Sequence, residues 1–256
     1  MRFLLPKGTS HLNQDSTLNN CIVTTSWDDG QLLDLKLSSL LLKYGLKGTF
    51  FMPRVWDNHK VDPDLVHGLS ENFEIGAHSL SHSNLTSLPL KDAANEIQGS
   101  KEWLEELLHH EIEMFSYPIG KYNNDILKLV KMAGFKGARS LDFQIALSTD
   151  PFHLGVGPQA SNGSPIIRLK GALKSNFSIK GLSNWSVNAK FLFDHILQKG
   201  GIWHLWGHSW EIEKNNDWQK LEDVLSYVSN RPGVAYLENR EVRKIMSGSS
   251  INCLHI

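Results

Sequence analysis

Short apolar runs alternate with longer amphipathic segments along most of the chain. The first run, residues 21–27, is apolar and rich in β-branched side chains, which predicts a strand. Further short apolar runs of this character lie at residues 48–52, 73–78, 114–117, 135–139, 202–206 and 234–237. The segments between them predict helices, at residues 32–44, 62–72, 89–109, 125–133, 187–199, 217–229 and 241–246. This alternation predicts an α/β fold with a parallel sheet and crossover helices, either open or closed into a barrel.

Two segments depart from this alternation. Residues 1–20 are polar and predict an irregular N-terminal segment. Residues 140–185 are rich in Gly and Pro, with short apolar pieces at 152–156 and 166–169, so we expect long loops there that decide specificity. Because no repeat or linker divides the rest, the sequence predicts a single catalytic domain over residues 21–247.

Composition narrows the function classes. A length of 256 residues suits an α/β barrel, and a net charge of −1 gives no basis for a nucleic-acid partner. The apolar stretch at the N-terminus is too short for a signal peptide and no run could span a membrane, which predicts a cytoplasmic protein. Cys21 and Cys253 are too few for a disulfide framework, so we expect free thiols, with a bridge between them as the alternative.

Acidic and imidazole side chains follow two of the predicted strands. Asp28 and Asp29 end the first strand, and His78 and His82 lie four residues apart after the third. One Asp and two His form a three-ligand site for a divalent metal with positions left open for water, and the other Asp is free to act as a base. Singly, an Asp-Asp-Gly sequence is typical of a turn, and the His spacing arises readily by chance. Their joint position at strand ends favours a site.

Four motifs occur in an order that resembles the polysaccharide deacetylases, the NodB-homology superfamily of carbohydrate esterase family 4. They are residues 26–30 (SWDDG), 78–82 (HSLSH), 115–120 (FSYPIG) and 206–208 (WGH). The resemblance covers about residues 21–240. It implies a distorted (β/α) barrel with about seven parallel strands.

The resemblance also implies a metal centre. Asp29, His78 and His82 would bind a divalent metal, most often Zn²⁺, with Co²⁺, Mn²⁺ or Ni²⁺ as alternatives. Asp28 would be the base that deprotonates the metal-bound water. The backbone N–H of Ile119 would help the metal to stabilise the oxyanion that forms at the amide carbonyl.

By the same resemblance, His208 would be the acid that protonates the departing amine. His204 lies four residues earlier but within the predicted strand, where we expect a packed histidine. The family's Asp that polarises this acid is not found cleanly. Asp142 and Glu211 are the candidates to replace it, and the alternative for Glu211 is a solvated carboxylate at the start of a helix.

One departure concerns the base. Many members of the family have an Arg that orients the base at the position of Ser116. Arg139 ends a neighbouring predicted strand and could supply this charge from there, with a plain surface Arg as the alternative.

Aromatic residues suggest where a sugar ring would lie. Four of the eight Trp gather in one short stretch, at positions 203, 206, 210 and 218, as either aromatic core or a stacking wall for a sugar. Tyr117 and Trp206 are candidates to line the sugar pocket, with core packing as the alternative.

The leading hypothesis is a metal-dependent hydrolase that removes N-acetyl groups from an N-acetylated sugar, which is polymeric, oligomeric or linked to a nucleotide or lipid. The first alternative is a deformylase or another non-peptide C–N amide hydrolase that acts on a small molecule. The second alternative is a catalytically inactive carbohydrate-binding homologue. The fold alone does not separate these functions.

Overall fold

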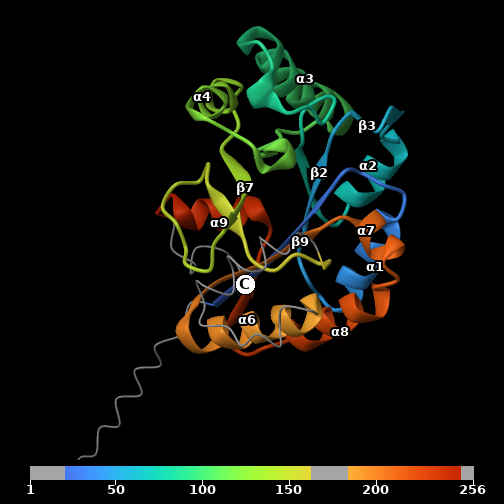
Figure 1. Ribbon diagram of the computed structural model, residues 1–256, viewed down its shortest axis with the longest axis vertical. Coiled ribbons are helices and arrows are strands. Elements are labelled where there is room, and N and C mark those ends of the chain that lie inside the picture. The colour runs from blue at the N-terminus through green and yellow to red at the C-terminus, as the bar shows by residue number, and fades with distance from the viewer. Residues whose placement is uncertain (1–20, 163–183, 249–256) are drawn as a thin grey trace, which may run out of the picture.

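The computed structural model describes residues 21–162 and 184–248, in which strands and helices alternate as predicted (Figure 1). The strands are β1 (Cys21–Asp28), β2 (Thr49–Met52), β3 (Val55–Trp56), β4 (His59–Lys60), β5 (Glu74–Ala77), β6 (Met114–Ser116), β7 (Gly137–Phe143), β8 (Leu154–Val156), β9 (Gly201–Gly207) and β10 (Val234–Tyr236). The helices are α1 (Asp34–Lys43), α2 (Pro63–Ser70), α3 (Leu90–Leu108), α4 (Asn124–Met132), α6 (Trp185–Lys199), α7 (Ser209–Lys214), α8 (Trp218–Val228) and α9 (Asn239–Met246). The predicted irregular segment 1–20, the apolar piece 166–169 and Cys253 lie outside the described residues.

The parallel strands form one strongly curled sheet around β1. From β1 the order runs through β2, β5, β6 and β7 to β8, and β9 pairs with the other edge of β1. After β8, the chain runs beside β9, where the N–H of Gly157 donates to His204 O at 2.8 Å and the N–H of Ala160 donates to Trp206 O at 2.7 Å. These hydrogen bonds bring the far end of the sheet back to its start. The predicted distorted barrel of seven parallel strands is confirmed, with the short β10 added beside β1.

A buried apolar cluster fills part of the barrel interior, toward the amino ends of the strands. Five strands contribute to it, through Ile22, Phe51, Met114, Leu154 and Ile202, and helix α9 covers it. Alternate residues of a strand point to the same face, so positions further along these strands also face the interior. A larger cluster fills the space between the outside of the sheet and the surrounding helices.

Local sequence signals explain where the helices begin. Asp62 accepts a hydrogen bond from the N–H of Asp64 at the start of α2, whose first residue is Pro63. Asn123 accepts bonds from two N–H groups at the start of α4. Such caps satisfy backbone donors that have no partner within the helix. No helix of the described ranges is long and apolar enough to cross a membrane.

Three features were not predicted as regular elements: β8, the hairpin of β3 and β4, and the short helix α7. Strand β8 lies at residues 154–156, where we expected long loops. The hairpin of β3 and β4 turns at Asp57 and Asn58, which both have positive φ, of 46° and 62°. Two residues per strand are too few to give a period, although Asp and Asn are the residues that suit such turns. The short helix α7 follows β9 directly and likewise lacks a full amphipathic repeat.

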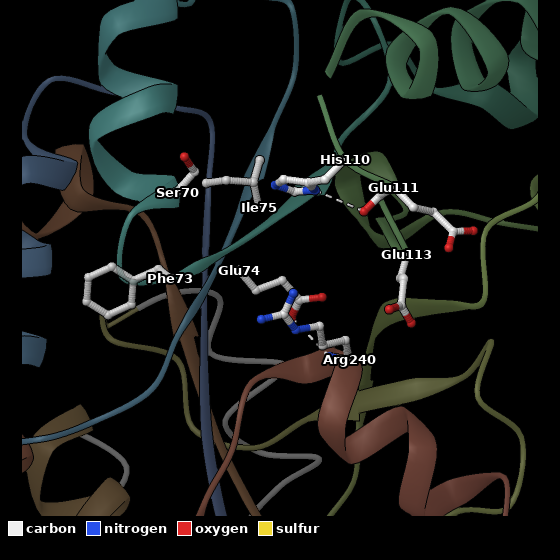
Figure 2. Close-up of a pocket in the computed structure, with 8 residues that line it drawn as sticks. All are labelled: Ser70, Phe73, Glu74, Ile75, His110, Glu111, Glu113 and Arg240. Carbon is white, nitrogen blue, oxygen red and sulfur yellow. Dashed lines mark hydrogen bonds between the residues drawn. The ribbon is translucent and has the colours of Figure 1, made fainter. Parts of the chain in front are cut away.

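A polar pocket lies at the amino ends of β5 and β6, between them and α9 (Figure 2). Its charged groups pair with the surrounding fold. Buried Glu74 accepts bonds from Thr49 Oγ1 at 2.6 Å and from the N–H of Arg240 at 3.0 Å. The guanidinium of Arg240 binds Glu238 at 2.7 Å, and Glu113 binds Arg243. These contacts tie α9 to the base of the barrel, which gives the pocket a structural role.

Candidate active site

The two adjacent aspartates lie where β1 ends at the opposite, carboxyl end of the sheet. Asp28 is the last residue of β1, and Asp29 follows with a left-handed φ of 84°. Gly30 continues the turn with φ of 63°, and a Cβ there would lie 2.8 Å from Met52 Sδ. Positive φ is costly for a non-Gly residue, and such conformations concentrate at functional sites. The turn gives the two buried carboxylates different partners.

The loop after β5 presents two imidazoles. Nδ1 of His78 donates to Ser116 O at 2.8 Å, which leaves its Nε2 without a proton and able to bind a metal. The rings of His78 and His82 lie 4.7 Å apart between centroids. Glu96 of α3 holds the loop between them, because its carboxylate accepts bonds of 2.8 Å from both the N–H and the hydroxyl of Ser81.

Asp29, His78 and His82 fit a divalent metal. One ligand atom from each lies within 4.8 Å of the others, and no other such group occurs in the described residues. Asp29 Oδ1 is buried without a hydrogen-bond partner, and burial raises the pKa of this carboxyl. Burial lowers the pKa of His78 to about 3, which keeps the imidazole in its ligating, neutral form. A cation bound by these three residues would give Asp29 Oδ1 the partner that it lacks. One carboxylate oxygen and two imidazole nitrogens are a donor set that suits a divalent ion.

Arg139 lies against Asp28 in the barrel interior. Its Nη2 donates to both carboxylate oxygens, and both residues are buried. Arg139 is paired with Ser116 on the neighbouring strand. Ser116 stands where the family resemblance predicts an Arg, so here the guanidinium comes from the adjacent strand instead. Burial opposes the charge of Asp28, but Arg139 and the nearby imidazoles more than offset it and lower the pKa of the carboxyl.

His208 faces the same centre from the end of β9. Its Nε2 is 3.8 Å from Asp29 Oδ2, and its Nδ1 contacts Glu211 Oε2 at 2.9 Å. Burial opposes its charge, but the bond to Glu211 and the two aspartates raise the pKa of His208. Burial also opposes the charge of Glu211, whose pKa the bond to His208 lowers. These shifts favour a protonated imidazole beside an ionised Glu211.

The other polar candidates lie apart from this centre. His204 is a packed strand histidine, which contacts Gly155 O at 2.8 Å and Ser26 Oγ at 2.9 Å, and burial lowers its pKa to about 3. Asp142 accepts bonds from Tyr122 at 2.7 Å and Ser140 at 3.1 Å. Of the two carboxylates considered for polarising the acid, Glu211 is the one that contacts it.

Of the remaining predicted residues, Trp206 lies inside the barrel, whereas Tyr117 belongs to the cluster outside the sheet. Ile119 has a left-handed φ of 59° in the turn after β6. Tyr117 is buried and its hydroxyl donates to Phe152 O at 3.3 Å. Trp206 is buried with its ring 5.7 Å from the Arg139 guanidinium, and its Nε1 has no hydrogen-bond partner. Their contact with a substrate stays a prediction, as does the role of the Ile119 N–H.

Sequence reasoning missed Trp56 and Glu96 near the centre, and it named Trp210 only as one of four clustered Trp, without its contact to Asp29. Trp210 Nε1 donates to Asp29 Oδ2 at 2.9 Å, and the Trp56 ring lies 5.8 Å from that of Trp210. Glu96 holds the His loop. The place of Trp210 two residues after His208 was a usable signal. A carboxylate on an amphipathic helix, such as Glu96, carries no signal of its own.

Comparisons with known proteins point to the same family as the sequence motifs. A family model for polysaccharide deacetylase matches residues 15–138. YxkH of Bacillus subtilis, provisionally named a polysaccharide deacetylase, is 27% identical over 153 residues, which are 58% of this chain and 52% of that protein. The predicted resemblance to the polysaccharide deacetylases is confirmed. The chain matches about half the length of this relative.

Solved structures of the family share the fold. A Mycobacterium smegmatis protein, also provisionally named a polysaccharide deacetylase, has a TM-score of 0.66 at 17% identity, over 89% of this chain and 90% of its own. A family 4 carbohydrate esterase pseudoenzyme from Bacillus anthracis has a TM-score of 0.53 at 14% identity, over 88% of this chain and 66% of its own. The polysaccharide deacetylase fold therefore does not by itself indicate activity.

The metal site can be tested without a substrate. We expect the protein to bind one equivalent of Co²⁺ or Zn²⁺ in equilibrium dialysis, and Asp29→Ala or His78→Ala to weaken this binding by about 100-fold or more, because each removes one of three ligands. His110→Ala, an exposed histidine in the distant pocket, is the matched control and should bind like the wild type. Equal binding by all variants would show that the ion lies elsewhere.

Proposed function

We propose that this protein is a metal-dependent amide hydrolase that removes N-acetyl groups from an N-acetylated sugar. The observation that carries the proposal is the charge pattern around Asp29. The guanidinium of Arg139 contacts Asp28 and favours its ionised form, and the carboxylate of Glu211 contacts His208 and favours its protonated form. A hydrolase needs this combination of a deprotonated base and a protonated acid on either side of one reacting centre.

The residues have separate tasks in the reaction. A divalent ion held by Asp29, His78 and His82 would supply a Lewis acid that acidifies water and polarises the acyl carbonyl. Asp28 accepts a proton from the attacking water as the new C–O bond forms. The N–H of Ile119 donates to the developing oxyanion.

Bond cleavage then depends on the acid. His208 Nε2 donates its proton to the amine nitrogen as the C–N bond breaks, which releases acetate and leaves the amine on the sugar. Glu211 holds the opposite ring nitrogen and stabilises the imidazolium. The unpartnered Nε1 of Trp206 and the ring of Tyr117 are the proposed contacts of the acylated sugar.

The family supports deacetylation over the alternatives, and Zn²⁺ and a cytoplasmic location remain predictions. A deformylase or another amide hydrolase would use the same groups and release a different acid. An inactive carbohydrate-binding homologue would not need Arg139 to lower the pKa of Asp28 or Glu211 to raise the pKa of His208, and this chain keeps both contacts. The pattern of charges therefore favours an active hydrolase.

Product analysis tests the proposed reaction. We expect metal-loaded protein to release acetate from N-acetylated sugars, offered free, as oligomers and linked to a nucleotide. Asp28→Asn should lower kcat by about 100-fold or more, because the base is lost while the metal ligands stay. Formate release from N-formyl sugars alone would move the assignment to a deformylase. Metal binding with no acid released from any substrate would contradict the proposed substrate class.

The role of Arg139 can be tested through the pH dependence of the reaction. Arg139→Gln removes the charge that keeps Asp28 ionised, so the pKa of Asp28 should rise and the acidic limb of the profile of kcat/KM against pH should move to higher pH. We expect kcat to fall by about 10- to 100-fold. The measurement is acetate release across pH.

A stability control separates this role from folding. A lone buried charge costs roughly 3–5 kcal/mol, so Arg139→Gln should also lower the free energy of unfolding. The double variant Asp28→Asn/Arg139→Gln should recover stability but not activity. An unchanged pH profile in Arg139→Gln would show that the guanidinium does not tune the base.

The acid can be tested through the leaving group. An amine needs a proton to leave, whereas the phenolate of an activated aryl acetate does not. We expect His208→Ala to slow acetamide hydrolysis by about 100-fold and Glu211→Gln by about 10-fold, with much smaller losses on aryl acetate. Asp142→Asn is the matched control for the carboxylate and should keep both rates. Equal losses on both substrates would contradict an acid role.

A further inference from the structure

Two of the eight Trp side chains are placed differently from the rest. Five of them belong to the main buried hydrophobic cluster or pack against it, at positions 27, 103, 185, 203 and 218, and Trp206 is buried inside the barrel. Trp56 and Trp210 are half-buried and are not among the described residues that form or flank the hydrophobic clusters. Core packing does not account for these two indoles.

The two indoles continue a row of rings that begins at the acid. The centroids of His208 and Trp210 are 5.3 Å apart with their planes tilted by 35°, and those of Trp210 and Trp56 are 5.8 Å apart with a tilt of 34°. The bond from Trp210 Nε1 to Asp29 fixes the row to the site. Trp56 lies on the hairpin of β3 and β4, whose next residues, 57–60, are exposed and polar.

The proposed reaction indicates which part of the substrate lies beside this row of rings. The acid must reach the amine nitrogen, and that nitrogen stays on the sugar after acetate leaves. The sugar is therefore on the His208 side of the centre, where the ring of Trp210 is the neighbour of the acid. An indole is a large, rigid apolar face with a polar edge, which suits the C–H face of a pyranose ring with its hydroxyls directed outward.

We propose that Trp56 and Trp210 form a stacking platform for a second sugar ring, joined to the one that is deacetylated. This inference rests on the proposed function and narrows its substrate to a chain of at least two linked sugars. A nucleotide-linked sugar fits less well, because the two indoles offer apolar ring faces and no charged partner to a pyrophosphate. A free monosaccharide would leave Trp56 without a partner.

The test compares substrate lengths. Wild-type protein should show a lower KM for the N-acetylglucosamine tetramer than for the monosaccharide or for UDP-N-acetylglucosamine. Trp56→Ala should raise the KM for the tetramer by about five- to ten-fold with kcat changed by less than about two-fold, because stacking acts on binding. Trp56→Phe should recover part of the loss. Trp218→Ala, which removes an indole that packs against the core at α8, is the matched control and should keep the KM.

A binding measurement keeps the inference separate from catalysis. In the Asp28→Asn background, calorimetric titration with the tetramer should give a Kd that Trp56→Ala weakens by about five- to ten-fold. Such binding without acetate release from the wild type would support the platform and contradict the proposed reaction. Acetate release with equal KM values for monomer and tetramer, or with no effect of Trp56→Ala, would overturn the platform alone. A preference for the nucleotide-linked sugar would overturn it as well.

Discussion

The buried ion pair between Arg139 and Asp28 is the interaction on which the site depends. Strands β1 and β7 are not neighbours in the sheet, since β2, β5 and β6 lie between them, so this contact crosses the barrel interior. Either charge left alone would be costly, because nothing in the interior could replace the lost water. The pair therefore favours the ionised base and also links two non-neighbouring strands across the barrel interior.

The barrel interior changes character from one end to the other. Along β9 the alternate residues are apolar Ile202, neutral His204, the indole of Trp206 and then, just past the strand, charged His208. Along β9 the apolar end is thus Ile202 and the most polar end is His208, and each buried polar ring except Trp206 has partners. The charges at the carboxyl end lie where a substrate and a metal can compensate them, whereas those at the amino end pair with one another and with α9.

The sequence predicted the chemistry of the centre better than its surroundings. Asp28, Asp29, His78 and His82 could be placed together because carboxyl ends of parallel strands meet at one edge. Arg139 could be suggested from its strand, but its contact with Asp28 depends on the curl of the sheet, which no local pattern encodes. The choice of Glu211 over Asp142 likewise depends on where α7 begins.

Trp56 shows why one proposed substrate contact escaped prediction. Strand-end residues belong to a repeating pattern of period two, whereas Trp56 lies on a hairpin too short to have one. Its partner Trp210 lies at the start of α7, which is also short. Because the hairpin contributes no strand to the barrel, Trp56 can change while the ion pair and the three candidate ligands stay in place. Trp210 is less free to change, because it bonds to Asp29 and precedes Glu211 on α7. The recognition of a second sugar would then vary mainly through the hairpin.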